Sequence, residues 1–344
     1  MDIWSPPVLL MTDHTDFEHA PVMLTEIVDI ATEFAPGIFA DLTLGGAGHS
    51  AAILEANPEL SLIGFDQDDV ALAAAQTRLE PLTPRWHVVK ARFDSAAQEL
   101  RNAGHDTISG FLMDLGVSSP QLDVPERGFS YRHDGPLDMR MDLSTTLTAA
   151  DVVNTYGIGE LIDVLQSYGD ERHAKRIARA IVDSRPVAGT VQLADVIAEA
   201  VPAPARRKST GHPAKRSFQA IRIEVNSELE ILADTVDQMI AMLAPGGVGL
   251  VLTYHSGEDR IVKDAMRRAI EAGALAGMDP ISDYRWNWRG ARVPSAQEIE
   301  TNPRARSARL RAITKVVPEE ARNCLLYTSP SPRDQRGSRM PSSA

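Results

Sequence analysis

A glycine-rich turn and the acidic residue that follows it are the positions in this sequence whose types and spacing best suit binding chemistry. The turn contains Gly45, Gly46 and Gly48 and follows a short apolar run that is closed by Asp41. Glycine lets the backbone approach a ligand where a Cβ atom would clash. Asp66 ends the next apolar run, 21 residues after Gly45, and an acid at such a position can bind both hydroxyls of a ribose. The pattern predicts a nucleoside site.

Two kinds of nucleoside ligand compete for this site. NAD favours the pattern G-x-G-x-x-G, with its pyrophosphate at a helix N-terminus. The turn here reads G-G-A-G-H, without the third glycine in place. S-adenosylmethionine has no phosphates, so the close approach and the ribose acid suffice for it. The sequence favours the methyl donor, and a nicotinamide-dependent oxidoreductase stays open as an alternative.

Three further residues are candidates for the same pocket. Asp114 ends a fourth apolar run, where it would lie near the adenine or the methionyl part of the donor. Phe93 ends a third run and either packs on the adenine face or belongs to the core. His49 stands at an expected helix start and is either a ligand contact or only a polar residue at that start.

These residues need a parallel sheet to bring them together. Short apolar runs within 38–50, 60–69, 86–93 and 108–116 are typical of buried parallel strands. Helical patterns lie between the first runs, and the second of these helices is expected at 70–79. A helix at 217–243 and a strand at 247–255 resume the rhythm later. Alternating strands and helices predict an α/β fold with a doubly wound sheet.

The middle of the chain departs from this rhythm. We expect residues 18–121 and 216–316 to form one discontinuous sheet domain. Residues 122–215 have helical patterns and predict a helical subdomain inserted into it, which would recognise the substrate. The segment 323–344 is rich in Ser, Pro and Arg, so we expect it to be disordered and foreign to the natural protein.

Composition excludes several classes of protein. The 344 residues carry a net charge of −12, and 43% of them are hydrophobic, as in a globular protein. The only cysteine is Cys324, which excludes a disulfide framework, a zinc knuckle and iron–sulfur ligation. No apolar run approaches the roughly 18 residues of a membrane span, and the first ten residues do not resemble a signal peptide. We therefore expect a cytoplasmic protein with no membrane contact and no metal.

Longer strings carry a specific resemblance. They are DLGVSSPQLDVPERGFSYRHDGPLDMRMD at 114–142, HPAKRSFQAIRIEVNSEL at 212–229, YHSGEDRIVK at 254–263 and NPRARSARLRA at 302–312, together with HAPVML at 19–24. The chain closely resembles the bacterial ribosomal RNA small subunit methyltransferase H family, also called MraW. The resemblance implies a Rossmann-like sheet that uses S-adenosylmethionine to methylate N4 of a cytidine in the decoding centre of 16S ribosomal RNA. The donor contacts that it implies are Ala47, Gly48, His49, Asp66, Phe93, Asp114 and Gln121.

The available residues suit an exocyclic amine better than a ring carbon. Methylation at cytosine C5 ordinarily needs a cysteine nucleophile, and the lone cysteine lies in the foreign segment. An amine needs positioning in line with the methyl group, and groups that accept hydrogen bonds from it. SSPQ at 118–121 looks like a variant of the short loop that amino-methyltransferases use there. The predicted catalytic groups are Asp114, Ser118, Ser119 and Pro120, unless Ser119 only caps a turn.

The sequence gives weaker signals for the residues that would stack on the base or accept its proton. Because SSPQ lacks a final aromatic residue, Phe129 or Tyr131 would stack on the base instead. His255 could act as a general base, but a structural role fits a lone histidine at a strand end better. Ser256 is expected to cap the helix that follows.

Basic stretches on an acidic chain suggest an RNA surface. Residues 165–225 contain 11 basic and six acidic residues, and residues 285–315 contain eight and two. Trp286 and Trp288 stand among arginines, a mixture that suits unpaired bases. The alternative is that these arginines form solvated helix faces. The predicted RNA contacts are Arg206, Arg207, Lys208, Lys215, Arg216 and Arg289.

The expected partner is 16S ribosomal RNA within the small ribosomal subunit, and a homodimer is possible. A third hypothesis is non-enzymatic: a ribosome assembly factor that binds the methyl donor without using it.

Overall fold

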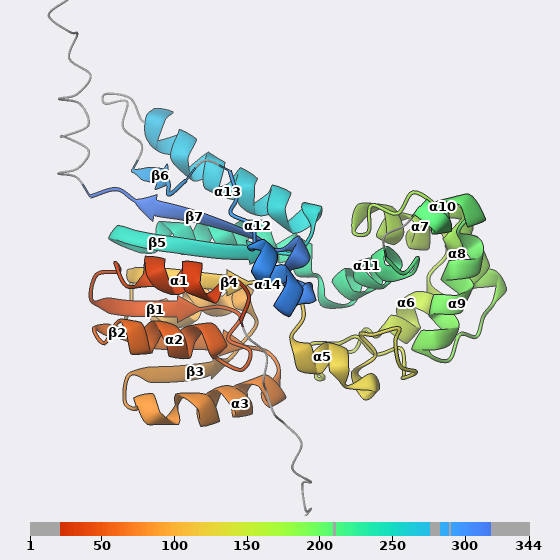
Figure 1. Ribbon diagram of the computed structural model, residues 1–344, viewed down its shortest axis with the longest axis horizontal. Coiled ribbons are helices and arrows are strands. Elements are labelled where there is room, and N and C mark those ends of the chain that lie inside the picture. The colour runs from red at the N-terminus through yellow and green to blue at the C-terminus, as the bar shows by residue number, and fades with distance from the viewer. Residues whose placement is uncertain (1–20, 209–210, 276–282, 289, 318–344) are drawn as a thin grey trace, which may run out of the picture.

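A mixed sheet of seven strands organises the described part of the chain, in the order β3-β2-β1-β4-β5-β7-β6 (Figure 1). The computed structural model describes residues 21–208, 211–275, 283–288 and 290–317. The first five strands are parallel, and β7 runs antiparallel to both β5 and β6. The fold is therefore α/β and doubly wound, as predicted. The strands are β1 (Gly37–Asp41), β2 (Leu60–Asp66), β3 (Trp86–Lys90), β4 (Ile108–Asp114), β5 (Leu243–Thr253), β6 (Tyr284–Trp286) and β7 (Arg309–Lys315).

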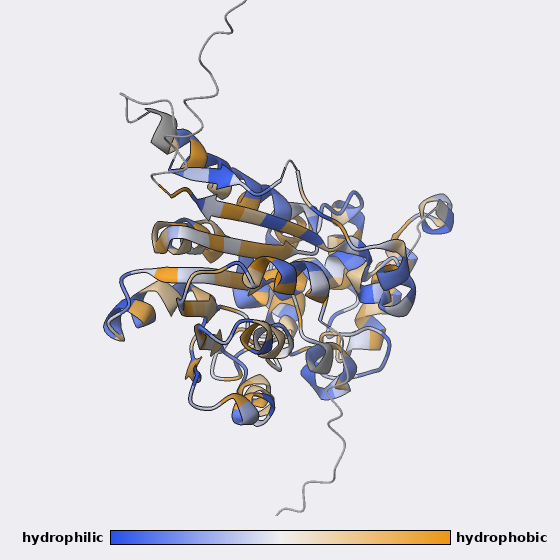
Figure 2. Ribbon diagram, turned by 60° about the vertical axis from the view of Figure 1, so that its left-hand side comes forward, coloured by the Kyte–Doolittle hydropathy of each residue, from blue (hydrophilic) through white to orange (hydrophobic). Residues whose placement is uncertain are grey.

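Helices bury both faces of this sheet, which explains why its strands are apolar runs rather than alternating patterns. Phe39 of β1 belongs to the core on one face, whereas its neighbour Ala40 belongs to the core on the other. Figure 2 shows hydrophobic residues along the central strands. One face is covered by α1 (Leu24–Ala31), α2 (Gly48–Ala56) and α3 (Asp69–Leu79), and the other by α4 (Ala96–Asn102), α12 (Glu228–Ala241) and α13 (Ser256–Leu275).

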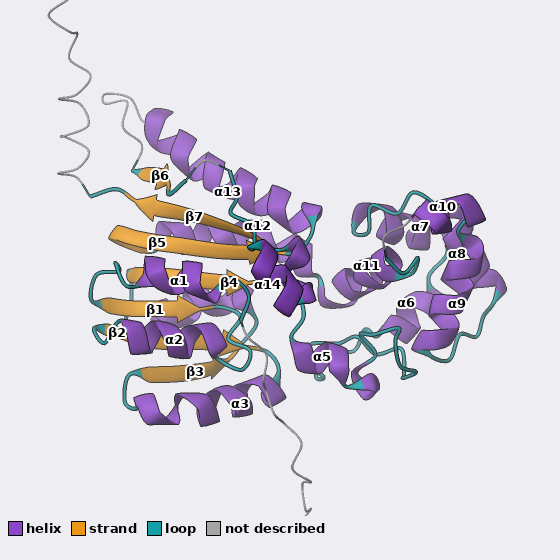
Figure 3. Cartoon of the chain, viewed as in Figure 1, coloured by secondary structure: helices purple, strands orange, loops and turns teal. Residues whose placement is uncertain are grey.

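A separate helical part lies beyond the carboxyl ends of the parallel strands (Figures 1 and 3). It has a hydrophobic core of its own, running from Phe129 to Val225. The helices of this part are α6 (Ala149–Thr155), α7 (Ile158–Ser167), α8 (Ala174–Asp183), α9 (Thr190–Ala200), α10 (Ala203–Lys208) and α11 (Lys215–Asn226). The core of this part extends past residue 215, where we placed the end of the insertion, because α11 packs on α6 and α7.

The single helix predicted at 217–243 is wrong. The chain forms α11 and α12 instead, and they are separated at Ser227, whose φ is +51°. A residue in the left-handed conformation turns the chain off the right-handed helical path, so helices commonly end there. The Asn226 side chain also holds the loop at 139–141, donating to Met139 O and accepting from Met141 N. The break lets α11 join the helical part while α12 covers the sheet.

Strand boundaries also differ from the predictions in places. β3 ends at Lys90, so Phe93 lies in a following 3₁₀ turn (Phe93–Ser95) and not in the strand. β5 begins at Leu243, four residues earlier than expected. The antiparallel strands β6 and β7 were not predicted.

Five short elements complete the described chain. They are α5 (Ser119–Asp123), α14 (Ala296–Thr301) and the 3₁₀ turns Glu80–Leu82, Pro125–Arg127 and Pro303–Ser307. Across the described ranges, no helix has the length and apolar character needed to cross a membrane. Arg289 and the segment 323–344, with Cys324, lie outside the described residues.

Candidate active site at the carboxyl ends of the strands

A cavity of about 1160 Å³ lies where the strand ends of the sheet face the helical part. Ligand pockets commonly measure about 300–1,000 Å³, so this one has room for a nucleoside and part of a second molecule. The sheet contributes Asp66, Asp114 and Tyr254, and the helical part contributes Tyr131 and Lys215. The predicted site residues that line it are Gly48, His49, Asp66, Phe93, Asp114, Ser118, Gln121 and Lys215.

Asp66 is held by backbone groups at the end of β2. Its Oδ2 accepts from the Gly45 amide at 2.8 Å, and its Oδ1 accepts from the Asp68 amide at 2.9 Å. Burial raises the pKa of this carboxyl group above its ordinary value, although both amides oppose the shift. A carboxylate oxygen can accept more than one hydrogen bond, so this group can also receive hydroxyls of a ribose.

The glycine turn has two different roles. Gly45 has φ +51°, and a Cβ there would meet nothing closer than the Thr43 carbonyl oxygen at 3.9 Å. A Cβ at Gly48 would instead lie 2.5 Å from Pro21 Cγ. The absent side chain at Gly48 thus makes room for the protein's own Pro21, a reason that differs from the ligand approach we expected. Ala47 is buried, with φ +58°.

Asp114 is fixed from several sides at the end of β4. Tyr254 donates its hydroxyl hydrogen to Asp114 Oδ1 over 2.7 Å, and the Asp114 amide donates to Thr43 Oγ1 over 2.6 Å. His49 Nδ1 lies 3.7 Å from Asp114 Oδ2. The other ring nitrogen of His49 is 2.9 Å from the carbonyl oxygen of Val22, so it must be the N–H donor there. His49 is therefore both a cavity residue and a tether for the chain before α1.

Gln121 stabilises the loop that carries the predicted catalytic groups. Its Oε1 accepts from the Ser118 amide at 3.0 Å, and its Nε2 donates to Asp68 Oδ2 at 3.2 Å. Ser118 lines the cavity, whereas the side chains of Ser119 and Pro120 lie outside what the structure describes.

The aromatic candidates separate clearly. Phe93 lines the cavity and also packs against the core of the sheet, so its core role leaves packing on the adenine face as a prediction. Phe129 is only 6% exposed and belongs to the helical core, which rules out base stacking by this ring. Tyr131 does line the cavity, where its ring stacks on His212 with centroids 4.6 Å apart.

The predicted RNA contacts are spread more widely than the cavity. Lys215 lines it, and Arg132 beside Tyr131 is a further cation there. Arg206 and Arg216 are exposed and donate to the carbonyl oxygens of Ala198 and Asp170. Arg207 is exposed on α10, and neither the Lys208 side chain nor Arg289 is described.

The tryptophans are partly buried against the sheet. Trp286 belongs to β6 and packs on one core of the sheet, while Trp288 packs on the other. The guanidinium of Arg292 lies 4.2 Å from the Trp288 ring centroid. The mixture of aromatic and arginine residues is thus an internal contact here.

His255 has a structural role. Its Nδ1 accepts from the Gly257 amide at 3.2 Å, which caps the start of α13. Ser256, the cap that we expected, instead donates its hydroxyl hydrogen to Asp170 Oδ2 of the helical part. His255 Nε2 lies 2.9 Å from Glu258 Oε1, at ion-pair distance but without hydrogen-bond alignment. The prediction that a structural role fits His255 best agrees with these contacts.

Sequence reasoning missed a buried group of charges on the cavity wall. Arg222 of α11 forms a two-pronged pair with Glu228 of α12, at 2.8 and 2.9 Å, and Glu258 lies 3.9 Å from the same guanidinium. Burial raises the pKa of Glu228 despite the neighbouring Arg222. Tyr254 was missed as well. Their only sequence signal was membership of the strings at 212–229 and 254–263.

Among the described residues, no group of three or more His, Cys, Asp or Glu side chains is arranged to hold a metal ion.

Known proteins share this sequence over most of its length. The sequence pattern of the MraW methylase family matches residues 16–316. The ribosomal RNA small subunit methyltransferase H of Thermobifida fusca is 48% identical over 305 residues, which cover 86% of this chain and 92% of that protein. The protein of the same name from Carboxydothermus hydrogenoformans is 46% identical over 312 residues, covering 88% and 99%.

One solved structure has a distant likeness to this chain. A putative methyltransferase from Streptococcus mutans in complex with SAH matches 85% of this chain and 97% of its own, with 12% identity and a TM-score of 0.36. A likeness at this level adds no evidence about function.

Proposed function

The chain belongs to the MraW methylase family, and from that premise we propose that it methylates N4 of a cytidine in the decoding centre of 16S ribosomal RNA. It is an S-adenosylmethionine-dependent ribosomal RNA methyltransferase. Membership of a methylase family leaves the nicotinamide-dependent alternative without support.

S-adenosyl-L-methionine supplies an electrophilic methyl group on a positively charged sulfur. The residues at the strand ends fit this donor. Asp66 offers carboxylate oxygens to ribose hydroxyls, and Gly45 leaves the approach open. Phe93 offers a flat ring to the adenine. Asp114 and Gln121 would hold the remainder of the donor, together with His49 and the backbone of 47–48.

Asp114 is the group best placed to orient the amine. The lone pair of a cytosine amine is delocalised into the ring, so the enzyme must hold the nitrogen in line with the methyl group. A carboxylate can accept an N–H hydrogen of that amine, and Asp114 is an acceptor fixed inside the cavity. The proton released afterwards can pass to water, so a strong base is not required. The backbone of Ser118, Ser119 and Pro120 would form the adjoining edge of the base site.

The helical side of the cavity suits RNA. Tyr131 offers an aromatic ring to a base turned out of its stack, and Arg132 and Lys215 offer positive charges to the phosphates on either side. Arg206, Arg207, Lys208, Arg216 and Arg289 would extend this contact along the strand. An assembled small subunit is the proposed substrate, since the decoding centre takes its shape there. Light scattering would measure whether the enzyme forms a homodimer.

One observation carries the proposal most directly: Asp66 and Asp114 share one cavity with Tyr131 and Lys215 of the helical part. The test uses small subunits from cells that lack this enzyme, incubated with donor labelled in its methyl group. We expect mass spectrometry to locate the label on N4 of a single decoding-centre cytidine. Label on C5 or on another nucleotide would overturn the site assignment.

Two further measurements separate the alternatives. Calorimetric titration with S-adenosylhomocysteine and with NADH should show binding of the first only. Saturable binding of S-adenosylhomocysteine, with no label in any RNA, would instead support the donor-sensing assembly factor.

A further inference from the structure

We propose that Tyr254 is a positioning residue for methyl transfer, acting through the carboxylate of Asp114. The inference rests on the proposed function, because it assumes that Asp114 orients the target amine. Tyr254 follows β5, and Asp114 ends the neighbouring strand β4. Both side chains line the cavity.

The Asp114 carboxyl group has neighbours on two different elements. The Tyr254 hydroxyl donates to Oδ1 over 2.7 Å, and His49 of α2 places Nδ1 3.7 Å from Oδ2. The χ2 torsion, which rotates the carboxyl group of an aspartate, has only weak rotamer preferences. The groups around the carboxyl therefore decide its orientation. Tyr254 makes the shorter of these two contacts, and its hydrogen bond restrains how Oδ1 faces the cavity.

Tyr254 is itself held at both ends. Its amide donates to Glu258 Oε2 over 2.7 Å, and the Glu258 side chain is only 3% exposed. Its ring lies against Gly116, where an added Cβ would come within 3.5 Å of the ring. Gly116 has φ +110°, a backbone conformation that residues other than glycine rarely adopt. The hydroxyl therefore has little freedom to leave Asp114.

The hydroxyl remains a donor at any working pH. Burial raises the pKa of Tyr254 well above its ordinary value, and the charge of Asp114 raises it further. A neutral phenol can donate to the carboxylate, whereas a phenolate would repel it. Hydrogen bonds to a charged acceptor are also stronger than those between neutral groups.

The consequence for the reaction is geometric. Displacement at a methyl group requires the attacking nitrogen to lie in line, and small misplacements of a reacting group can cost large factors in rate. Losing the hydroxyl would leave Asp114 in the cavity but remove the hydrogen bond that restrains its Oδ1. Asp114 would stay in the cavity as one donor contact, beside Asp66 and the glycine turn, so donor binding should change little.

The test compares Tyr254→Phe with Tyr156→Phe. The Tyr156 hydroxyl also donates to a carboxylate, Glu224 Oε1 at 2.8 Å, but it belongs to the helical core and does not line the cavity. Both changes remove one hydroxyl and keep the ring. Single-turnover methyl transfer is measured with saturating donor and with enzyme in excess over subunits, and S-adenosylhomocysteine affinity is measured by calorimetry.

We expect Tyr254→Phe to lower the single-turnover rate constant at least tenfold while the affinity for S-adenosylhomocysteine stays within threefold. Tyr156→Phe should keep both near the wild-type values. In an Asp114→Asn background, where the acceptor is neutral, removing the Tyr254 hydroxyl should cost less than threefold.

Three results would overturn the inference: an unchanged rate in Tyr254→Phe, a loss of donor affinity as large as the loss of rate, or the same tenfold loss in the Asp114→Asn background. The proposed function fails separately, since it falls only if the wild-type enzyme places no label on N4.

Discussion

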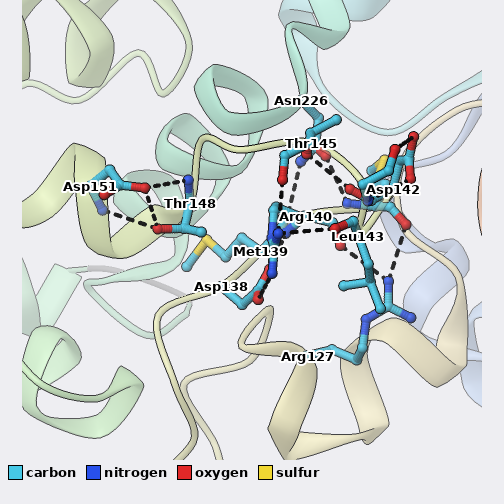
Figure 4. A network of polar contacts seen from close by, with 12 residues as sticks. Arg127, Asp138, Met139, Arg140, Asp142, Leu143, Thr145, Thr148, Asp151 and Asn226 are labelled. Atoms are coloured by element: carbon cyan, nitrogen blue, oxygen red, sulfur yellow. Dashed lines mark hydrogen bonds and ion pairs between the residues drawn. The ribbon is translucent and has the colours of Figure 1, made fainter.

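The Arg127 guanidinium donates to the Asp68 carboxylate over 2.8 Å and so ties the loop after α5 to the turn that holds Asp66. The Asp68 amide in turn donates to Asp66. The other arm of Arg127 donates to the carbonyl oxygens of Arg140 and Met141, at 3.1 and 3.3 Å (Figure 4). The two ends of the chain segment 68–141 are thus connected through one side chain. Both partners of the ion pair are largely buried.

Replacing Arg127 with Met should lower the free energy of unfolding by about 3 kcal/mol, because it leaves a buried carboxylate without its cation. Urea denaturation measures this change. The matched control is Arg268→Met, whose ion pair with Asp237 is about half exposed on both sides and should contribute less than about 1 kcal/mol. Equal effects of the two substitutions would contradict a special role for the Arg127 pair.

Asp66→Ala should weaken S-adenosylhomocysteine binding by about tenfold or more, since hydrogen bonds to a charged group contribute about 1.5–3 kcal/mol each. Calorimetric titration is the measurement. Asp69→Ala serves as the control, because Asp69 is 74% exposed and pairs only with Lys90 at the surface. Unchanged affinity in Asp66→Ala would show that the ribose lies elsewhere.

Asp41 should make stability depend on pH. It is buried at the end of β1, and burial raises its pKa to about 6, although Ser50 donates to it over 2.6 Å. A raised pKa means that the folded state holds the proton more tightly than the unfolded state, whose ordinary pKa is 3.8. The stability that this group contributes is therefore complete below pH 3.8 and is lost as the pH rises through about 6.

The variant Asp41→Asn cannot ionise and should lack this dependence. Between pH 4 and 7, its free energy of unfolding should gain about 2 kcal/mol relative to the wild type. Urea unfolding of both proteins at each pH tests this, because titrating groups that do not interact with Asp41 contribute equally to the two curves. Parallel curves would mean that Asp41 does not titrate in this range.

RNA binding should depend strongly on salt. If about six phosphates are neutralised, affinity should fall roughly 10³-fold between 50 and 200 mM salt. Lys215→Gln should reduce the slope of log affinity against log salt by about 0.7–0.9, the contribution of one phosphate. Arg267→Gln is the control, since Arg267 is half exposed on α13 and pairs with Asp264 and Glu271. A slope that is the same in Lys215→Gln and wild type would remove Lys215 from the RNA surface.

Local patterns in the sequence sufficed for the parallel sheet and for the acids that end its strands. A strand buried on both faces must be apolar, so the first charged residue after an apolar run indicates where the strand ends. Asp41, Asp66 and Asp114 are such residues. The strings that identify the family are also local. Patterns of this kind did not reveal the break at Ser227, because neither glycine nor proline marks that left-handed residue.

The sequence by itself therefore determined the fold class, the family and two acids, Asp66 and Asp114, that line the cavity. Only the tertiary structure decided which side chains meet them. Tyr254 reaches Asp114 across 140 residues of chain, and Arg127 reaches Asp68 across 59. It also showed that Gly48 accommodates Pro21 and that Phe129 is buried. The reason is physical: periodicity along a chain reports which residues are buried, whereas a hydrogen bond between distant residues depends on how strands pair and helices pack.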